Sequence, residues 1–409
     1  MRVVIAGGGI GGLTAAMALH AKGIDVQVYE GVQHLQPLGV GINVLPHAMA
    51  HLDRLGLLDT LLPLGVPTAE LCFFNQHGQL IWREPRGVAA GYPVPQLSVH
   101  RGQLHMALLA EARARLGDER VVSGHSVAGF QERVDGRVAV NVVPRDQSTG
   151  FEDVADVLVA ADGIHSTIRA AFHPNEGMPH WSGNILWRAT TRSAPFLTGR
   201  SMFMAGHLPH KFVAYPISEV GDDGLCTVNW IAELDRSHFG LSKREDWNKV
   251  GVLTDFLPRF EDWVWDWLDI PALVRGADTV FEFPMVDRDP LDRWTHGRVT
   301  LLGDAAHPMY PIGSNGASQA IIDAFTLADL LSGTADIDAA LRAYDDERRP
   351  KTAAIVLSNR QHGPERMLDL AHERAPEGFA DIHDVFAEGE REAIAAQYKQ
   401  VAGFSLPPK

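Results

Sequence analysis

The sequence predicts an α/β fold in which a parallel-sheet domain is interrupted by an antiparallel-sheet domain and followed by C-terminal helices. Two distant segments carry this prediction. An apolar β-run at 3–6 leads into Gly7-Gly8-Gly9-Ile10-Gly11-Gly12, and a second β-run at 298–302 stops at Gly303-Asp304 before a helix begins near Ser314 or Asn315. Each segment has the strand–loop–helix order of a ligand-binding corner.

The N-terminal segment has the complete pattern of a Rossmann-like unit. Gly7, Gly9 and Gly12 have the G-x-G-x-x-G spacing, residues 13–22 read as a helix, and residues 25–30 read as the next strand. The glycines allow a tight turn, a close approach to a pyrophosphate and close helix–strand packing. Glu30 ends the second strand 18 residues after Gly12 and is suited to a ribose hydroxyl. The segment therefore predicts binding of an adenine dinucleotide.

The second segment adds an acid and a helix N-terminus. The Asp304 carboxylate can accept hydrogen bonds from hydroxyl groups, and the helix that follows offers free N–H groups to negative charge. Alone, this stretch is equally compatible with an ordinary strand–loop–helix corner.

Between these segments the pattern changes along the chain. A loop around 38–42 precedes a helix from 46 to about 57, and a further helix runs from His100 to about Leu116. Strands are expected over 127–143, with a turn at Asp135-Gly136, and over 156–161. Aromatic-rich alternating runs from about 181 to 283 indicate an antiparallel sheet, with a helical interlude near 243–268. We expect one domain from 1–70, 100–180 and 284–360, a sheet domain from 71–99 and 181–283, and a C-terminal helical segment at 361–409.

Composition restricts the partners and the compartment. The net charge of −15 argues against nucleic acid and anionic membranes, and no apolar run reaches the length of a membrane span. Cys72 and Cys226 are far apart and match no metal or redox spacing, so we expect buried thiols in a cytoplasmic protein. No His/Cys cluster has metal spacing, so no metal is expected. The stretch 360–409 is compatible with a monomer, which it would cap, or with a homodimer.

Three motifs in order carry a family resemblance. They are the glycine motif at 7–12, Asp162-Gly163-Ile164-His165-Ser166-Thr167-Ile168-Arg169, and Gly303-Asp304-Ala305-Ala306-His307-Pro308. Together with Tyr344-x-x-x-Arg348-Arg349-Pro350 they resemble the single-component FAD-dependent aromatic hydroxylases of the p-hydroxybenzoate and salicylate hydroxylase type, over roughly residues 1–360. Segments 37–43, 215–217 and 284–291 resemble the phenazine-carboxylate hydroxylase branch. The resemblance implies a Rossmann-like FAD-binding domain with an interleaved antiparallel-sheet substrate domain and C-terminal helices.

The resemblance also implies roles for single residues. Gly7, Gly9 and Gly12 would contact FAD, with Glu30 at the adenosine ribose, Arg101 near the pyrophosphate and Asp304 at the ribityl chain. Gly316 and Ala317 would present N–H groups to the flavin pyrimidine. Pro311 would lie beside the reacting flavin edge, and Gly313 would let the substrate approach it. Asp162 would act near the nicotinamide nucleotide and the FAD pyrophosphate, with Arg169 supporting its motif.

The implied reaction consumes NADH or NADPH and dioxygen. Reduced FAD would form a C4a-hydroperoxide that hydroxylates a small aromatic or heteroaromatic molecule, with a phenolic or a carboxylated substrate as open alternatives. The sequence has no second G-x-G-x-x-G motif, so we expect NAD(P)H to bind transiently. Two alternatives stay open: an FAD-dependent reductase or dehydrogenase of the same fold that does not use oxygen, and a non-catalytic protein of the dinucleotide fold.

Candidates for the substrate pocket rest on weaker signals. They are Trp187, Arg188, Met202, Met204, Tyr215, Trp230, Pro308 and Tyr310. For each aromatic residue, packing in the core is an equal or better explanation. Arg188 is a candidate for holding a substrate carboxylate, or else lies on a solvated strand. Trp263, Trp265 and Trp267 have period-two spacing that indicates domain packing, and His307 is a structural residue or a general base.

Overall fold

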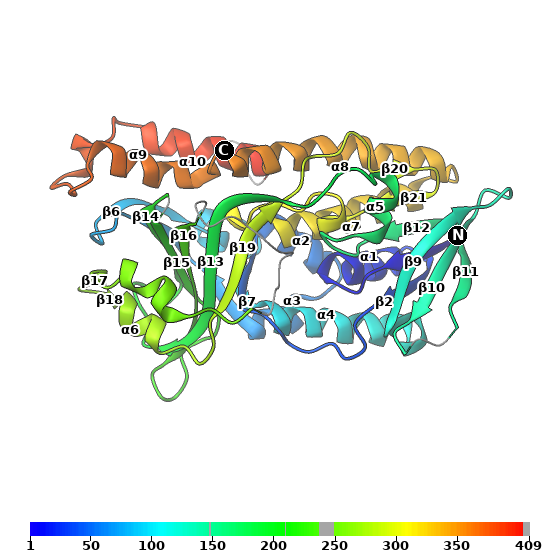
Figure 1. The fold of residues 1–409 in the computed structure, drawn as a ribbon, viewed down its shortest axis with the longest axis horizontal. Coiled ribbons are helices and arrows are strands. Elements are labelled where there is room, and N and C mark those ends of the chain that lie inside the picture. Colours follow the sequence, from blue (N-terminus) through cyan, green and yellow to red (C-terminus); the bar gives the residue numbers. More distant parts are fainter. Residues whose placement is uncertain (147–148, 209, 237–248, 404–409) are drawn as a thin grey trace.

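The computed structural model describes residues 1–146, 149–208, 210–236 and 249–403. Within these residues, six strands form a sheet that is parallel except for the β20–β21 pair at one edge (Figure 1). In spatial order they are β20 (Thr295–His296), β21 (Val299–Leu301), β12 (Val157–Ala160), β1 (Arg2–Ala6), β2 (Asp25–Glu30) and β8 (Val121–Ser123). The strands β12 and β21 are apolar and buried at every position, as expected for a sheet covered on both faces.

Helices and a small meander cover this sheet. The helix α1 (Ile10–His20) contacts both α4 (Arg101–Leu116) and α7 (Gly316–Gly333), and α7 also contacts α2 (Pro46–Arg54). The short α3 (Leu58–Leu61) follows α2. The meander consists of β9 (His125–Glu132), β10 (Val138–Pro144) and β11 (Phe151–Ala155), and β9 contacts α5 (Thr167–Phe172). The expected strand pair and its turn at Asp135-Gly136 are thereby confirmed.

A larger antiparallel sheet lies at the opposite end of the molecule in Figure 1. Among the described residues it has seven strands: β19 (Phe281–Asp287), β13 (His180–Ser193), β16 (Cys226–Asp235), β15 (His210–Pro216), β14 (Ser201–His207), β5 (Glu70–Phe74) and β6 (Leu80–Pro85). Only the β14–β5 pair within this sheet is parallel. The predicted α/β fold with an interleaved antiparallel sheet is therefore confirmed.

A further small sheet of three strands was not expected from the sequence. The strands β3 (Gly41–Val44) and β4 (Gly65–Thr68) both pair with β7 (Gln96–His100). The expected loop around 38–42 thus runs into a strand, and the end of the 71–99 stretch pairs here rather than with β5 and β6. The strand β7 also contacts β15, so this small sheet lies against the seven-stranded one.

The C-terminal helices run along one long side of the molecule and reach both large sheets (Figure 1). The helix α8 (Ile337–Arg360) packs on α7, whereas α9 (Arg366–Arg374) contacts β5, β6 and β14; α10 (Glu390–Ala402) contacts both α8 and α9. Met367, Leu368 and Ala395 of these last helices are buried in one cluster with Phe73 and Met204 of the seven-stranded sheet. The prediction of helices after residue 360 is confirmed for the described part of the chain.

The helix expected near 243–268 is wrong wherever the structure describes it. Residues 243–248 lie outside the described residues, and from 249 onward the chain forms two 3-10 turns and the hairpin strands β17 (Val264–Trp265) and β18 (Leu268–Asp269), before α6 (Ile270–Arg275). The period-two spacing of the tryptophans reflects this hairpin. Trp263 is 5% exposed and packs with the core on the other face of the seven-stranded sheet, beside the partly buried Trp265 and Trp267.

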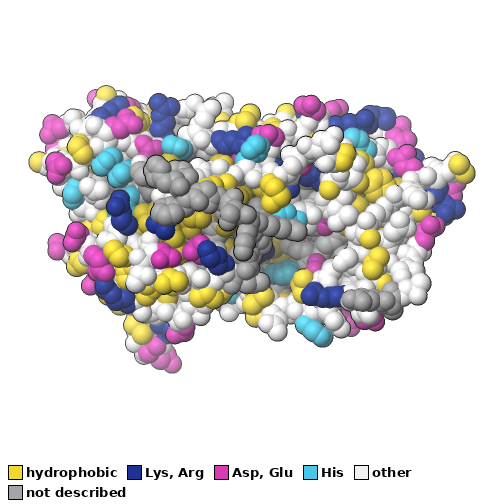
Figure 2. All heavy atoms as spheres, viewed as in Figure 1, with side chains coloured by type: hydrophobic (Ala, Val, Ile, Leu, Met, Phe, Trp, Pro, Cys, Tyr) yellow, Lys and Arg dark blue, Asp and Glu magenta, His cyan; other side chains and the backbone are white. Residues whose placement is uncertain are grey.

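The remaining short elements and the surface complete the description. The 3-10 turns are η1 (Leu62–Leu64), η2 (Gly87–Ala90), η3 (Asp118–Arg120), η5 (Leu253–Asp255), η6 (Leu257–Arg259), η7 (Gly303–Ala305), η8 (Ile312–Ser314), η9 (Gly363–Glu365) and η10 (Ile382–Asp384). Within the described ranges, no helix combines the length and apolarity needed to cross a membrane. Figure 2 shows acidic and basic side chains interspersed over one face, without a continuous basic area there. Cys72 and Cys226 are buried free thiols.

Candidate functional site

The three motif glycines differ in what surrounds them. A Cβ atom on Gly7 would lie 2.4 Å from the Ala161 carbonyl oxygen, and one on Gly12 would lie 2.0 Å from the Gly7 carbonyl oxygen. At Gly9, no described atom lies within 4 Å of that position. Gly7 and Gly12 therefore bring β1, β12 and α1 together, whereas Gly9 leaves open space at the N-terminus of α1, where a pyrophosphate fits.

Glu30 is fixed beside this loop by backbone donors. One carboxylate oxygen accepts from Gly8 N at 2.7 Å and the other from Val32 N at 2.7 Å. Each oxygen keeps a further lone pair for a ribose hydroxyl. The His105 ring on α4 lies with Nε2 2.6 Å from the Gly8 carbonyl oxygen, a support for the loop that the sequence pattern did not reveal.

The 162–169 motif follows β12 and contacts the loop that follows the neighbouring strand β21. Asp162 accepts from Thr167 N at 2.9 Å, and its other carboxylate oxygen, Oδ1, is buried with no hydrogen-bond partner among the described residues. Burial raises the pKa of this carboxyl above its usual value. Arg169 is 1% exposed and donates to the Ala305 and Ala306 carbonyl oxygens at 3.1 and 2.8 Å. Arg169 thus fixes the loop that follows Asp304.

Asp304 faces the start of α7. A Cβ on Gly316 would have Asp304 Oδ1 as its nearest neighbour, at 4.0 Å. The Asp304 side chain reaches solvent, although burial raises the pKa of its carboxyl; the charges of His307 and Arg101 act in the opposite direction. The carboxylate is therefore accessible to a ligand that lies at the start of α7. Arg101, at the start of α4, lies close enough for its charge to act on this carboxyl.

The N-terminus of α7 offers free donors at the same place. Its N-cap residue Asn315 makes no side-chain cap hydrogen bond within the described chain, so the first-turn N–H groups, Gly316 and Ala317 included, remain available. Pro311 and Gly313 lie in the turn just before it, and Gly313 has a left-handed φ of 66°. We call the residues at this place the rim: Asp304, Pro311 and Gly313 before α7, and Gly316 and Ala317 at its start.

His307 belongs to a buried ion network rather than to this rim. Its Nε2 lies 2.5 Å from Asp323 Oδ2, and the other oxygen of Asp323 accepts from Arg348 Nε at 2.7 Å. His307 is 3% exposed and Asp323 is fully buried. Asp323 Oδ2 also accepts from Gly303 N at 3.2 Å, so the network fixes the backbone just before Asp304. The geometry supports the structural interpretation of His307.

The strand register collects some of the pocket candidates on one face of the seven-stranded sheet. Tyr215 lies opposite Asn229, and Arg188 lies opposite Ile231, which shares the face of Asn229. The strand β3 covers this face: Gly41 N donates to Asn229 Oδ1 at 2.7 Å, and Asn43 Nδ2 lies 3.6 Å from the Met202 sulfur.

Arg188 is the unusual group on this face. It donates to the Gly41 carbonyl oxygen at 2.9 Å and to the Tyr215 hydroxyl, and its Nε is buried without a partner among the described residues. Burial lowers the pKa of Arg188 and raises the pKa of Tyr215 to about 12. The charge of Arg101 lies close enough to lower the pKa of Arg188 further. Within the described chain, no acid forms an ion pair with Arg188.

Two further polar atoms are left over around β3. Asn229 Nδ2 and Gln96 Oε1 are buried and have no hydrogen-bond partner in the part of the chain that the structure describes. Buried polar atoms in native proteins are normally paired, so orphaned ones beside an unpaired cation point to a polar ligand. No signal in the sequence identified Asn229 or Gln96.

Two other candidates lie on the same face: Met204 shares it with Met202, and Tyr310 packs against Leu186, which shares the face of Arg188. Trp187 and Trp230 are on the opposite face of the sheet, where Trp187 stacks on Phe256 at 5.0 Å and Trp230 donates to Thr191 at 2.9 Å. Tyr310 packs in a small apolar cluster with Leu186 and Met285, near the end of the sheet. Pro308 is buried beside His307, whereas Met204 packs under α9.

These arrangements fit FAD. Gly9 provides space for a pyrophosphate, Glu30 and Asp304 provide acceptors for hydroxyls, and the α7 N-terminus provides donors for a polar ring edge. The described residues contain no cluster of three or more His, Cys, Asp or Glu side chains that would hold a metal ion.

Comparison with known proteins agrees with this geometry. Residues 1–197 and 279–358 match the family model described as FAD binding domain. The chain is 45% identical over 364 residues to the phenazine 1,6-dicarboxylic acid hydroxylase PhzS of Lysobacter antibioticus, covering 88% of this chain and 89% of that protein. It is 32% identical over 375 residues to a 3-amino-4-hydroxybenzoate 2-monooxygenase of Streptomyces platensis, covering 89% and 88%.

A solved structure supports the fold. The Klebsiella pneumoniae protein HpxO, complexed with FAD and uric acid, has a TM-score of 0.73 and 24% identity to this chain, covering 98% of this chain and 93% of that one. At this identity the likeness establishes the architecture and leaves the substrate undetermined.

Proposed function

The chain belongs to the FAD binding domain family, among the FAD-dependent aromatic hydroxylases, and from this premise we propose that it hydroxylates a fused heteroaromatic carboxylate. The proposed substrate class follows the relative that acts on phenazine 1,6-dicarboxylic acid. The reaction would convert a ring C–H, dioxygen, NAD(P)H and a proton into a ring C–OH, water and NAD(P)⁺. NADH is the favoured reductant because the sequence has no obvious basic cluster for a 2′-phosphate.

The chemistry that bound, reduced FAD would supply is activation of dioxygen and transfer of one oxygen atom to the substrate ring. The protein residues bind and orient. Glu30 and Asp304 would accept hydrogen bonds from the ribose and the ribityl chain, and Asp162 would lie near the pyrophosphate. The N–H groups of Gly316 and Ala317 would stabilise negative charge on the flavin pyrimidine. Pro311 and Gly313 would border the space where the ring to be oxidised lies.

Arg188 is the observation that carries the substrate class. Its acceptors, the Gly41 carbonyl and the Tyr215 hydroxyl, are both neutral, and burial disfavours its charge. A partly buried cation without an acid costs free energy, which a carboxylate ligand would recover. Since Arg188 Nε and Asn229 Nδ2 are orphaned donors, a carboxylate could accept from both sides. Tyr215 would orient the guanidinium and stay protonated, because its pKa is about 12.

The test combines a substrate series with a matched pair of variants. The holoenzyme is given NADH or NADPH with phenazine-1,6-dicarboxylic acid, phenazine-1-carboxylic acid or unsubstituted phenazine, and products are weighed by mass spectrometry. We expect carboxylated substrates to gain one oxygen. Arg188→Met should raise KM for them by about 10- to 100-fold, the size of a lost charge-assisted hydrogen bond, and leave unsubstituted phenazine unchanged.

The control is Arg192→Met on the same strand. Arg192 is 48% exposed and pairs with Asp223 at 2.7 Å, so its loss should leave KM unchanged. If no carboxylated heteroaromatic gains an oxygen, the proposed reaction is wrong. If Arg188→Met changes both substrate types equally, Arg188 does not bind a carboxylate.

The alternative reductase or dehydrogenase is not favoured by the named relatives, which are hydroxylases and monooxygenases. It predicts NAD(P)H oxidation without an oxygenated product. The non-catalytic alternative predicts neither NAD(P)H oxidation nor an oxygenated product. Two buried free thiols agree with the cytoplasmic location that we propose. Light scattering of the purified protein would distinguish a monomer from a homodimer.

A further inference from the structure

The loop before α7 has a strained backbone. Two successive residues, Gly313 and Ser314, have left-handed φ values of 66° and 59°. A non-glycine residue in this region costs on the order of 1–2 kcal/mol, so surrounding contacts must hold Ser314 there. This loop is also where we place the flavin edge and the substrate.

One side chain from the C-terminal helix α10 contacts the loop at several points. The Tyr398 hydroxyl accepts from Asn315 Nδ2 at 2.7 Å and lies 3.2 Å from the Ile312 carbonyl oxygen, to which it can donate. It lies equally far from Asn359 Oδ1, and Asn359 Nδ2 in turn donates to the Tyr310 carbonyl oxygen at 3.1 Å. Tyr398 therefore stands at the centre of the bonds that define the loop.

The ring of Tyr398 is also fitted to this backbone. A Cβ atom on Gly313 would lie 1.9 Å from the Tyr398 hydroxyl oxygen. One on Gly363, which also has a positive φ, would lie 2.9 Å from the ring. Tyr398 is 5% exposed and packs between these two glycines. A side chain at either glycine would displace it.

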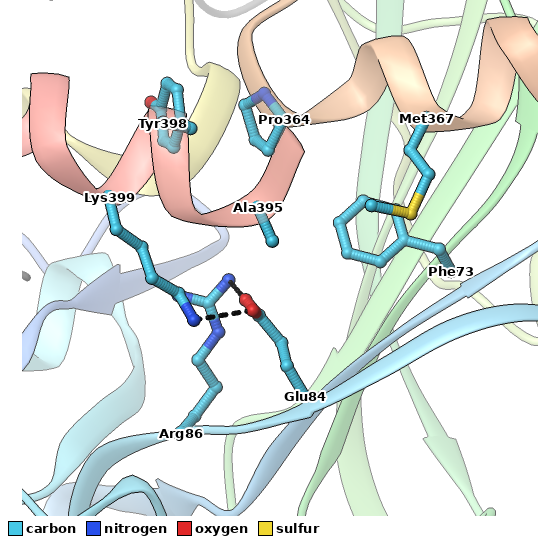
Figure 3. A pocket seen from close by; sticks show the side chains of 8 residues that line it. All are labelled: Phe73, Glu84, Arg86, Pro364, Met367, Ala395, Tyr398 and Lys399. Atoms are coloured by element: carbon cyan, nitrogen blue, oxygen red, sulfur yellow. Dashed lines mark ion pairs between the residues drawn. The ribbon is translucent and has the colours of Figure 1, made fainter. Parts of the chain in front are cut away.

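The helix α10 is itself anchored at this position (Figure 3). Lys399, the next residue, pairs with Glu84 of β6 at 2.6 Å, and Arg86 pairs with the same acid. Ala395 and Tyr398 line the same small pocket with Met367 of α9. The anchored helix gives Tyr398 a fixed place from which to hold the loop.

The network continues from the loop to the rest of the site. Asn315 Oδ1 accepts from Gln319 Nε2 at 3.3 Å, and Gln319 Oε1 accepts from Arg348 at 2.6 Å. Arg348 pairs with Asp323, which fixes the backbone before Asp304. The loop at the flavin edge and the Asp304 turn are thus parts of one bonded frame.

We propose that Tyr398 is a positioning residue that fixes the 310–315 loop for FAD, which makes the C-terminal helix part of the active site. The family match ends at residue 358, so this role falls in a segment that the family model does not cover. The proposal rests on the placement of the flavin edge at this loop. It assigns Tyr398 no contact with FAD or substrate, since it acts through Asn315 and the Ile312 carbonyl.

The test compares Tyr398→Phe with Tyr344→Phe. Each substitution removes one buried hydroxyl, and Tyr344 donates at 3.0 Å to the Leu301 carbonyl oxygen, away from the loop. The readouts are the FAD dissociation constant, the visible absorption of bound flavin without substrate, and the melting temperature. We expect Tyr398→Phe to weaken FAD binding by about 3- to 10-fold, the value of one lost hydrogen bond, and to shift the flavin absorption.

Tyr344→Phe should lower the melting temperature about as much as Tyr398→Phe does, because each variant loses one buried hydroxyl. It should leave the flavin absorption and the FAD affinity unchanged. If Tyr398→Phe has wild-type FAD affinity and absorption, or if both variants change them equally, Tyr398 has only a packing role. Asn315→Ala removes the same link from the loop side and should reproduce the spectral shift, should Tyr398→Phe not fold. Neither readout needs substrate or oxygen, so a failed hydroxylation assay leaves this test intact.

Discussion

The parallel-sheet region buries an arginine beside an acid, whereas the antiparallel-sheet region holds a partly buried arginine without one. Arg348, on α8, donates to Asp323 at 2.7 Å and to Gln319 at 2.6 Å. Arg188, on β13, finds only the Gly41 carbonyl and the Tyr215 hydroxyl. An acid and a further hydrogen bond stabilise the Arg348 charge within the fold. Arg188 has only neutral partners, so its charge can still pair with an acidic ligand.

Two buried asparagines repeat this contrast. Asn315, before α7, uses Nδ2 toward Gly313 and Tyr398 and Oδ1 toward Gln319. Asn229, on β16, accepts from Gly41 N and leaves Nδ2 unused among the described residues. The hydrogen bonds around Asn315 are thus complete within the protein, whereas the face of the seven-stranded sheet keeps an unpaired polar atom at Asn229, where we propose that the substrate binds.

The largest effect expected from this comparison concerns stability. Arg348→Met leaves Asp323 buried with one partner fewer and should lower the free energy of unfolding by about 3–5 kcal/mol. Arg188→Met removes a partly buried charge that has no acid beside it, so it should change the free energy of unfolding by less than about 1 kcal/mol, or raise it. Urea unfolding of the two substrate-free variants measures both values. Equal losses would show that Arg188 is also part of the architecture.

The sequence revealed the cofactor region because backbone chemistry dictates it. Glycines at Gly7, Gly9 and Gly12 and acids at strand ends are demanded by close approaches and hydroxyl contacts, so they have recognisable spacing. The helix start near Asn315 was placed within two residues of the observed α7. Their assigned contacts with FAD stay predictions.

The sheet face was hidden from the sequence for a physical reason. Residues on both faces of the seven-stranded sheet are buried, so apolar and polar residues do not alternate clearly. Trp187 and Arg188 are neighbours in the sequence yet point to opposite faces. Only the strand register separates the core residues Trp187 and Trp230 from Arg188 and Tyr215. The helix expected near 243–268 is wrong for a related reason, because the tryptophan spacing alone does not show that β17 and β18 pair in a hairpin.

A second prediction separates packing from ligand space within the glycine motif. Gly12→Ala places a Cβ 2.0 Å from the Gly7 carbonyl oxygen. Because the clash is with backbone rather than with the end of a flexible side chain, the strain should cost about 1–3 kcal/mol of stability in the protein stripped of FAD.

Gly9→Ala is the matched control. Gly9 has an ordinary φ of −74°, and no described atom lies within 4 Å of the new Cβ, so the melting temperature of the FAD-free protein should stay at the wild-type value. The loss should appear instead in FAD affinity, measured by fluorescence titration. If Gly9→Ala bound FAD like wild type, the space at Gly9 would not receive the pyrophosphate.

The smallest effect tests whether the complete frame of the parallel-sheet region tolerates one more charge. His47, on α2, lies 3.5 Å from Gln319, and its pKa is lowered to about 3 by burial first and then by the charges of Arg348 and His51. In the unfolded chain its pKa is about 6.5, so below that value the unfolded state binds a proton that the folded state refuses. The stability that His47 confers is complete above about pH 6.5 and is lost progressively as the pH falls toward 3. Between about pH 7.5 and pH 6 the loss should be about 1 kcal/mol, and His47→Gln should abolish this part of the pH dependence in urea unfolding. If the free energy of unfolding of His47→Gln depends on pH as it does in the wild type, the folded protein accepts the proton at His47. The network around Arg348 would then tolerate a further positive charge.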